Sequence, residues 1–288
     1  MSRCTARLRG RCLTLAIGAT VIVGSACSDI PSDPKTPFAI ELNRAPSPSV
    51  VLGTAMFDSI GIVTPLKAIV YNSKGDVIAG AAVSYHVVPR DTIPLVVDAT
   101  TGQITGKSDP RYAAHTARVY AQAGSLQSQP ITVTVTRRAD ALVAAGPLED
   151  SLPLRFTSLD SLPVSPAFSV RVRHAPAAPE TAADSTVPAY LVRFKIVQPS
   201  GVEVNDTAYV TLTNGDHRRS ELDTTDASGV ASRQVRVRRT NFPFAKAADA
   251  NGIIHDTILV RASAYRDGPS LVPGSGLQFR LIITARKP

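Results

Sequence analysis

The chain has 288 residues, 44% of them hydrophobic, which is enough apolar material for packed cores and excludes a wholly disordered protein. Tryptophan is absent and only 5% of the residues are aromatic, so the cores must be built mainly from Val, Ile, Leu and Ala. The formal net charge is +8, but residues 1–26 contain four arginines and no acidic residue, which leaves +4 for the remainder. This small excess, without aromatic residues interleaved among the arginines, argues against a nucleic-acid-binding protein.

The N-terminus has the pattern of an export signal. Basic residues precede an apolar segment at 13–23, and the small residues 24–26 lead directly to Cys27. The segment 13–26 is shorter than the roughly 20 apolar residues that a membrane-spanning helix needs. We therefore predict that residues 1–26 are a signal peptide, with an uncleaved anchor as an alternative.

Removal of the predicted signal peptide takes away Cys4 and Cys12, so Cys27 is the one cysteine left and no internal disulfide can form. A single cysteine at the new N-terminus of an exported protein fits lipidation. The residues before it, Ser25 and Ala26, resemble those of the signals that a lipoprotein-specific peptidase removes in bacteria. This resemblance implies that Cys27 carries a lipid that anchors the protein to a membrane, whereas ordinary cleavage would release the protein. Residues 27–37 contain three prolines after position 30 and are expected to form the lipidated N-terminus and an extended linker.

Residues 38–137 are predicted to form a β-sandwich. Alternation of apolar and polar residues indicates strands, and no apolar stretch with helical period reaches three turns. We expect the clearest strands at residues 67–71, 83–87, 95–98, 103–106, 116–121 and 130–136.

The series of strands and turns resembles the bacterial immunoglobulin-like domains of invasin- and intimin-type surface proteins. The resemblance implies an immunoglobulin-like sandwich of about seven strands. Tyr85 stands where many family members carry tryptophan. The residues that match are the Asn72-Ser73-Lys74-Gly75 turn, Val83-Ser84-Tyr85, residues 97–106 (VDATTGQITG) and residues 131–135 (ITVTV).

Residues 138–288 are predicted to form a second immunoglobulin-like sandwich with long loop insertions. We expect residues 142–166 to be irregular, and residues 174–188 and 241–252 to be insertions outside the core. Strands are expected at residues 168–172, 190–197, 208–212, 229–238, 257–264 and 277–284.

A Thr-Asp-x-x-Gly turn precedes one of these strands and resembles the turn of a second type of bacterial immunoglobulin-like domain. We expect Asp226 to accept hydrogen bonds from nearby backbone N–H groups and Gly229 to adopt a positive φ. Asp206, Asp223 and Asp226 are also candidate calcium ligands, but the chain has no Asp-x-Asp-x-Asp-Gly loop, which favours a turn-stabilising role.

No catalytic, metal or cofactor site is predicted. The five histidines are scattered and have no cysteine partners, so a zinc site is disfavoured. His255 and Asp256 lack the Gly-x-Ser-x-Gly motif that often accompanies a serine hydrolase triad.

Basic residues at alternate positions of three predicted strands form the candidate binding site. Strand geometry places each pair opposite the apolar residues of its own strand, so neighbouring strands would build one cationic face. A solvated face that prevents aggregation is the simpler interpretation. Contact with an anionic glycan, lipopolysaccharide phosphate or a membrane surface is the functional one. The residues are Arg171, Arg173, Arg193, Lys195, Arg236 and Arg238.

These features predict a non-enzymatic bacterial cell-envelope lipoprotein that presents immunoglobulin-like domains for adhesion or for binding an envelope or surface partner. A structural spacer or assembly subunit is the main alternative, followed by a carbohydrate-binding accessory protein. We expect an exported protein at the outer membrane or cell surface, with the periplasmic side as the alternative.

Overall fold

The computed structural model describes residues 33–88, 93–155, 162–175, 185–197, 201, 203–204, 206–207 and 209–286. The predicted signal peptide and Cys27 therefore lie outside the described residues. Within the described part of the chain, no helix is long and apolar enough to cross a membrane. The fold is all-β, as predicted, with short 3₁₀ turns such as Pro110–Tyr112 and Arg239–Asn241.

Among its described residues, the N-terminal sandwich, residues 39–136, contains nine strands. One sheet has the order β2-β9-β7-β4 with β8 paired to β7, and two further ladders, β1 with β3 and β5 with β6, also contribute to the core. β2 runs parallel to β9, whereas the other pairs are antiparallel. The strands are β1 (Ala39–Leu42), β2 (Ser49–Val51), β3 (Ala68–Tyr71), β4 (Ser84–Val87), β5 (Leu95–Val97), β6 (Ile104–Gly106), β7 (Thr116–Ala123), β8 (Leu126–Gln127) and β9 (Ile131–Thr136).

Tyr85 of β4 is one of the buried residues of this core. Its ring is buried, and its hydroxyl accepts a hydrogen bond of 3.2 Å from the backbone N–H of Ala68. Gly102 approaches the ring so closely that an added Cβ would lie 2.9 Å from the Tyr85 ring and 2.9 Å from the Leu66 carbonyl oxygen. Tyrosine therefore fills this core and also satisfies a backbone donor.

The C-terminal sandwich, residues 141–286, pairs a four-stranded sheet in the order β10-β12-β17-β15 with a six-stranded sheet in the order β11-β21-β18-β13-β14, on which β16 pairs with β13. This is the strand order of an immunoglobulin-type sandwich, with the first strand split between the sheets. The strands are β10 (Ala141–Ala144), β11 (Glu149–Leu154), β12 (Phe168–Arg173), β13 (Leu191–Val197), β14 (Glu203–Val204), β15 (Val210–Thr213), β16 (Leu222–Thr224), β17 (Val230–Val237), β18 (Ile253–Ser263), β19 (Tyr265–Asp267), β20 (Ser270–Leu271) and β21 (Leu277–Arg286).

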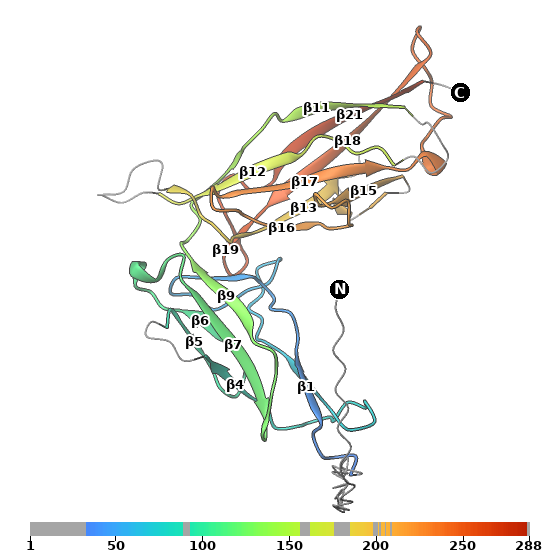
Figure 1. The fold of residues 1–288 in the computed structure, drawn as a ribbon. Helices are drawn as coiled ribbons and strands as arrows, with labels where there is room; N and C mark the ends of the chain where they lie inside the picture. The colour runs from blue at the N-terminus through green and yellow to red at the C-terminus, as the bar shows by residue number, and fades with distance from the viewer. Residues whose placement is uncertain are drawn as a thin grey trace, which may run out of the picture.

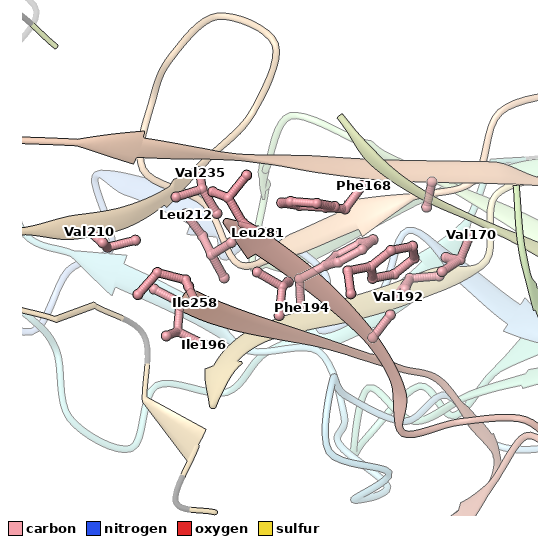
Figure 2. Packing of buried hydrophobic residues seen from close by; sticks show 14 of the residues in the cluster. Phe168, Val170, Val192, Phe194, Ile196, Val210, Leu212, Val235, Ile258 and Leu281 are labelled. Carbon is pink, nitrogen blue, oxygen red and sulfur yellow. The ribbon is translucent and has the colours of Figure 1, made fainter. Parts of the chain in front are cut away.

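Alternate residues of the two sheets meet in a single apolar core, as Figure 2 shows for Phe168, Phe194 and Leu281. The rings of Phe168 and Phe279, from facing sheets, lie 5.4 Å apart. With few aromatic residues available, Val, Ile and Leu supply most of the remaining contacts, as composition indicated.

Three predictions for this sandwich are wrong. Residues 142–166 are not irregular throughout, because β10 and β11 begin within or beside this stretch. β11 was missed because it contains Pro153. Proline has no backbone N–H to donate, and an edge strand tolerates this because one of its sides has no partner strand. The insertions are not outside the core either, since Val187 and Phe242 are both buried in it. Most of the first insertion, residues 176–184, lies outside the described residues.

The two sandwiches touch directly, one beyond the other (Figure 1). The hydroxyl of Thr136, at the end of β9, donates a hydrogen bond of 2.8 Å to the Pro188 carbonyl oxygen. A Cβ added at Gly61, whose φ is +80°, would lie 2.2 Å from the Gly268 carbonyl oxygen. The short connection between β9 and β10 thus joins two bodies that are packed at their ends.

Candidate functional site

Four of the six predicted basic residues lie on the outer face of the four-stranded sheet. In β12, Phe168, Val170 and Val172 are buried and the alternate residues point outward, among them Arg171 and Arg173. β17 is the neighbour of β12, and Arg236 of β17 shares this outer face. Arg238 follows at the next outward position, just beyond the strand, and is exposed.

The four arginines form two separate pairs along this face. Arg171 is the register partner of Val230, whereas Arg236 lies six residues further along β17. At about 3.3 Å per residue, this places the pairs about 20 Å apart. We call Arg171 and Arg173 the junction pair, and Arg236 and Arg238 the distal pair.

β17 runs from the junction between the two sandwiches to the far end of the C-terminal sandwich. Gly229, just before this strand, packs against Val187, and Pro188 touches the N-terminal sandwich. β17 therefore begins beside the junction and ends at the far end of the C-terminal sandwich. The distal pair lies at that far end.

Arg193 and Lys195 do not share this face, because β13 belongs to the six-stranded sheet. Lys195 is buried and forms an ion pair with Glu221, whose Oε2 atom also lies 3.9 Å from Nε of Arg193. Burial, and next the charge of Arg193, lower the pKa of Lys195. Strand parity predicted that both residues point away from the apolar side of β13, yet Lys195 is buried, and parity contains no information on which sheet of a sandwich a strand joins.

No carboxylate of the described residues forms an ion pair with either arginine pair. The Nε atoms of Arg171, Arg173 and Arg236 are covered by protein and make no hydrogen bond there. These side chains thus lie along the sheet without an ion pair to a described carboxylate, although the charge of Arg171 helps to lower the pKa of the nearby Asp226. Such a face can attract anions, and salt in solution screens it.

The aspartates considered as calcium ligands all have protein partners. The Asp226 carboxylate accepts hydrogen bonds from the Val230 N–H at 3.0 Å, the Ser228 N–H at 2.8 Å and the Ser228 hydroxyl at 2.7 Å. These bonds, that from Val230 first, hold the pKa of Asp226 below its usual value. The turn-stabilising role is confirmed for Asp226, whereas Asp206 and Asp223 form ion pairs with Arg219 and Arg233. Across the described residues, no group of three or more His, Cys, Asp or Glu side chains could hold a metal.

His255 and Asp256 do not form a catalytic pair, because they point to opposite faces of β18. His255 is exposed, and its Nε2 atom lies 3.1 Å from Oδ2 of Asp249. Asp256 faces the core, where it pairs with the Lys246 ammonium and accepts the Tyr209 hydroxyl. Burial, together with this hydrogen bond, raises the pKa of Tyr209. Sequence reasoning missed this polar cluster, in which only Asp256 is buried, since Tyr209, Lys246 and Asp256 come from three separate segments.

A cleft of about 660 Å³ lies between the two sandwiches and was also missed. Its walls come from segments far apart in the chain, so no local pattern could indicate it. The lining residues are Arg44, Ala45, Pro46, Pro48, Leu191, Leu212, Asn214, Arg219, Ser220, Glu221, Leu222, Asp223, Thr224 and Arg233.

Comparison with known proteins finds no matching family model and no matching curated protein. Among solved structures, human protocadherin-24 EC1-2 is 15% identical over 88% of this chain and 100% of that chain, with a TM-score of 0.25. The adhesin InvE of Yersinia pseudotuberculosis is 12% identical over 86% of this chain and 58% of that chain, with a TM-score of 0.28. The I9-I11 tandem of titin is 11% identical over 86% of this chain and 66% of that chain, with a TM-score of 0.25. Similarities this distant carry no argument about function.

Proposed function

We propose that this protein is a non-enzymatic lipoprotein of the bacterial cell envelope that holds a cationic surface away from the membrane to bind an anionic partner. In this proposal Cys27 carries the lipid, residues 28–37 are the linker, and residues 38–137 and 138–288 are two immunoglobulin-like domains. The export-type N-terminus and the position of Cys27 support the lipid anchor.

The observation that carries the proposal is the position of the distal pair. Arg236 and Arg238 lie at the end of the C-terminal sandwich that is remote from the N-terminal sandwich, and no described carboxylate neutralises them. With a lipid at Cys27, the distal pair is on the domain further from the membrane. Two arginines on one strand face are about 7 Å apart, a spacing that suits neighbouring anionic groups on a glycan.

A binding experiment separates this function from a general effect of charge. The probe is immobilised polygalacturonate, with dextran as the neutral surface, and the variants are Arg236→Ser/Arg238→Ser and Arg171→Ser/Arg173→Ser. We expect loss of the distal pair to weaken binding by about tenfold or more and the matched junction-pair variant to have a smaller effect. Equal effects of the two variants, or equal binding to dextran, contradict a specific role of the distal pair.

The lipid anchor needs its own test. We expect the wild-type protein to partition into the detergent phase and a Cys27→Ala variant to remain in the aqueous phase. Protease treatment of intact cells then reports whether the protein is exposed outside. Unchanged partition of the variant refutes the anchor, and protection until the envelope is opened refutes adhesion to external partners.

A structural spacer is the second candidate function. The direct contacts between the sandwiches, through Thr136 with Pro188 and Gly61 with Gly268, favour a fixed arrangement of the two domains. A spacer tolerates loss of the distal pair but fails when either domain is deleted. Complementation of a deletion strain with both kinds of variant distinguishes the two functions.

A further inference from the structure

The cleft between the sandwiches has the size of a small-molecule site. Its volume of about 660 Å³ lies within the roughly 300–1,000 Å³ that such sites occupy in proteins. One wall is the segment from Arg44 to Pro48, which connects β1 to β2 in the N-terminal sandwich. The other wall is built from β16 and from the ends of β13 and β15 in the C-terminal sandwich.

Both walls are held in place by the protein itself. Arg233, whose side chain is only 7% exposed, forms an ion pair of 3.0 Å with Asp223 and a hydrogen bond of 3.1 Å with the Ser220 hydroxyl. On the opposite wall, Pro46 and Pro48 restrict the backbone by their fixed φ. The cleft therefore requires no ligand to form.

The charges around the cleft do not balance. The two lining carboxylates, Glu221 and Asp223, are already paired with Lys195 and Arg233. Counting the lining residues and their ion-pair partners, five basic side chains stand against three carboxylates, an excess of two positive charges. The basic residues are Arg44, Arg193, Lys195, Arg219 and Arg233, and the acidic ones are Asp206, Glu221 and Asp223.

Two arginines on opposite walls carry the accessible part of this excess. Arg44 is exposed and forms no ion pair with the described carboxylates. Arg219 is 65% exposed and is held by Asp206 at 2.7 Å. A guanidinium group donates several hydrogen bonds from one plane, which suits carboxylate and phosphate groups.

We propose that this cleft binds a small anionic ligand, a carboxylate or phosphate carried by a hydroxyl-bearing molecule such as a sugar acid or sugar phosphate. Arg44 and Arg219 hold the anion from the two sides, and the side chains of Asn214 and Ser220 bind hydroxyl groups. Because the ligand contacts both sandwiches, its binding also stabilises their junction. This site is separate from the distal pair, and its test does not depend on the lipid anchor.

Isothermal titration calorimetry on the full chain tests the proposal with galacturonate, glucose 6-phosphate, inorganic phosphate and neutral galactose. We expect saturable binding of at least one anionic probe and none of galactose. Arg44→Ser and Arg219→Ser should each weaken binding by about tenfold. Arg118→Ser, which removes an exposed arginine of β7 outside the cleft, is the matched control and should leave binding unchanged.

Asp206→Asn makes the test more specific, because it acts in the opposite direction. It frees Arg219 from its competing carboxylate, so binding should become tighter even though the variant loses an ion pair. Binding of galacturonate alone identifies a carboxylate ligand, and binding of both phosphate compounds identifies a phosphate ligand. Absence of saturable binding with all three anions, or equal affinity in wild type, Arg44→Ser and Arg219→Ser, overturns the proposal.

Discussion

Gly229 and Gly252 offer a matched test of how closely the C-terminal sandwich is packed beside the junction. Both glycines have a φ of +74°, and both belong to this sandwich. A Cβ added at Gly229 would lie 2.8 Å from the Val172 carbonyl oxygen, whereas one added at Gly252 would meet nothing within 4 Å. Substitution by alanine therefore imposes the same backbone strain at both sites but a steric clash at only one.

The expected magnitudes follow from these two contributions. Left-handed backbone strain costs alanine about 1–2 kcal/mol, and reduced freedom of the unfolded chain returns about 0.4–1 kcal/mol of this. Gly252→Ala should therefore destabilise by at most about 1.6 kcal/mol. At Gly229, the clash with the backbone of Val172 destabilises the sandwich by about 1–3 kcal/mol more, because β12 cannot move without disturbing the core.

Hydrogen exchange at the amides of β12 and β17 measures the free energy of opening of the C-terminal sandwich. It is not affected by the separate opening of the N-terminal sandwich. We expect Gly229→Ala to lower this free energy by about 1–3 kcal/mol more than Gly252→Ala does. Equal losses in the two variants would show that the 2.8 Å approach is relieved without cost, and would refute the packing argument.

Two further substitutions test single polar interactions. Tyr85→Phe removes the acceptor of the Ala68 N–H inside the N-terminal core, so urea unfolding should show a loss of about 1 kcal/mol, and an unchanged midpoint would contradict the bond. The pKa of Asp226 is lowered in the folded protein by the Val230 N–H and the Ser228 hydroxyl, so its stabilisation is present above the unfolded value of 3.8 and is lost as the pH falls through the folded value. Asp226→Asn should therefore be less stable than wild type at pH 7, and the difference in unfolding free energy should shrink below about pH 4. Urea titrations at pH 7 and below about pH 4 measure this difference, and an equal difference under the two conditions would refute the role.

Features that depend on local residues could be predicted from the sequence. The alternation in residues 131–136 specifies a strand with Val133 and Val135 in the core, because side chains on a strand alternate between its faces. The Asp226 to Gly229 turn was also predictable, since a short acidic side chain and a positive φ are needed within four residues. The all-β fold follows from many such local patterns.

Edge position and burial were less predictable, because they depend on neighbours that the local pattern does not contain. Pro153 reads as a strand breaker, yet it is accommodated in β11 at the edge of the six-stranded sheet. Phe242 lies in a stretch with the composition of a loop, but its ring packs against Tyr209 at 5.6 Å and enters the core.

By itself, the sequence predicted an export-type N-terminus and a cysteine placed for lipidation, and it determined strands with basic residues opposite apolar ones. Only the tertiary structure decided which of these basic residues share a surface. It placed β12 and β17 in one sheet and β13 in the other, which separates Arg193 and Lys195 from the distal pair. It also brought Arg44 and Arg219 to the same cleft from different sandwiches. The physical reason is that side-chain period is a local property of a strand, whereas sheet membership and domain contacts come from pairing between distant segments.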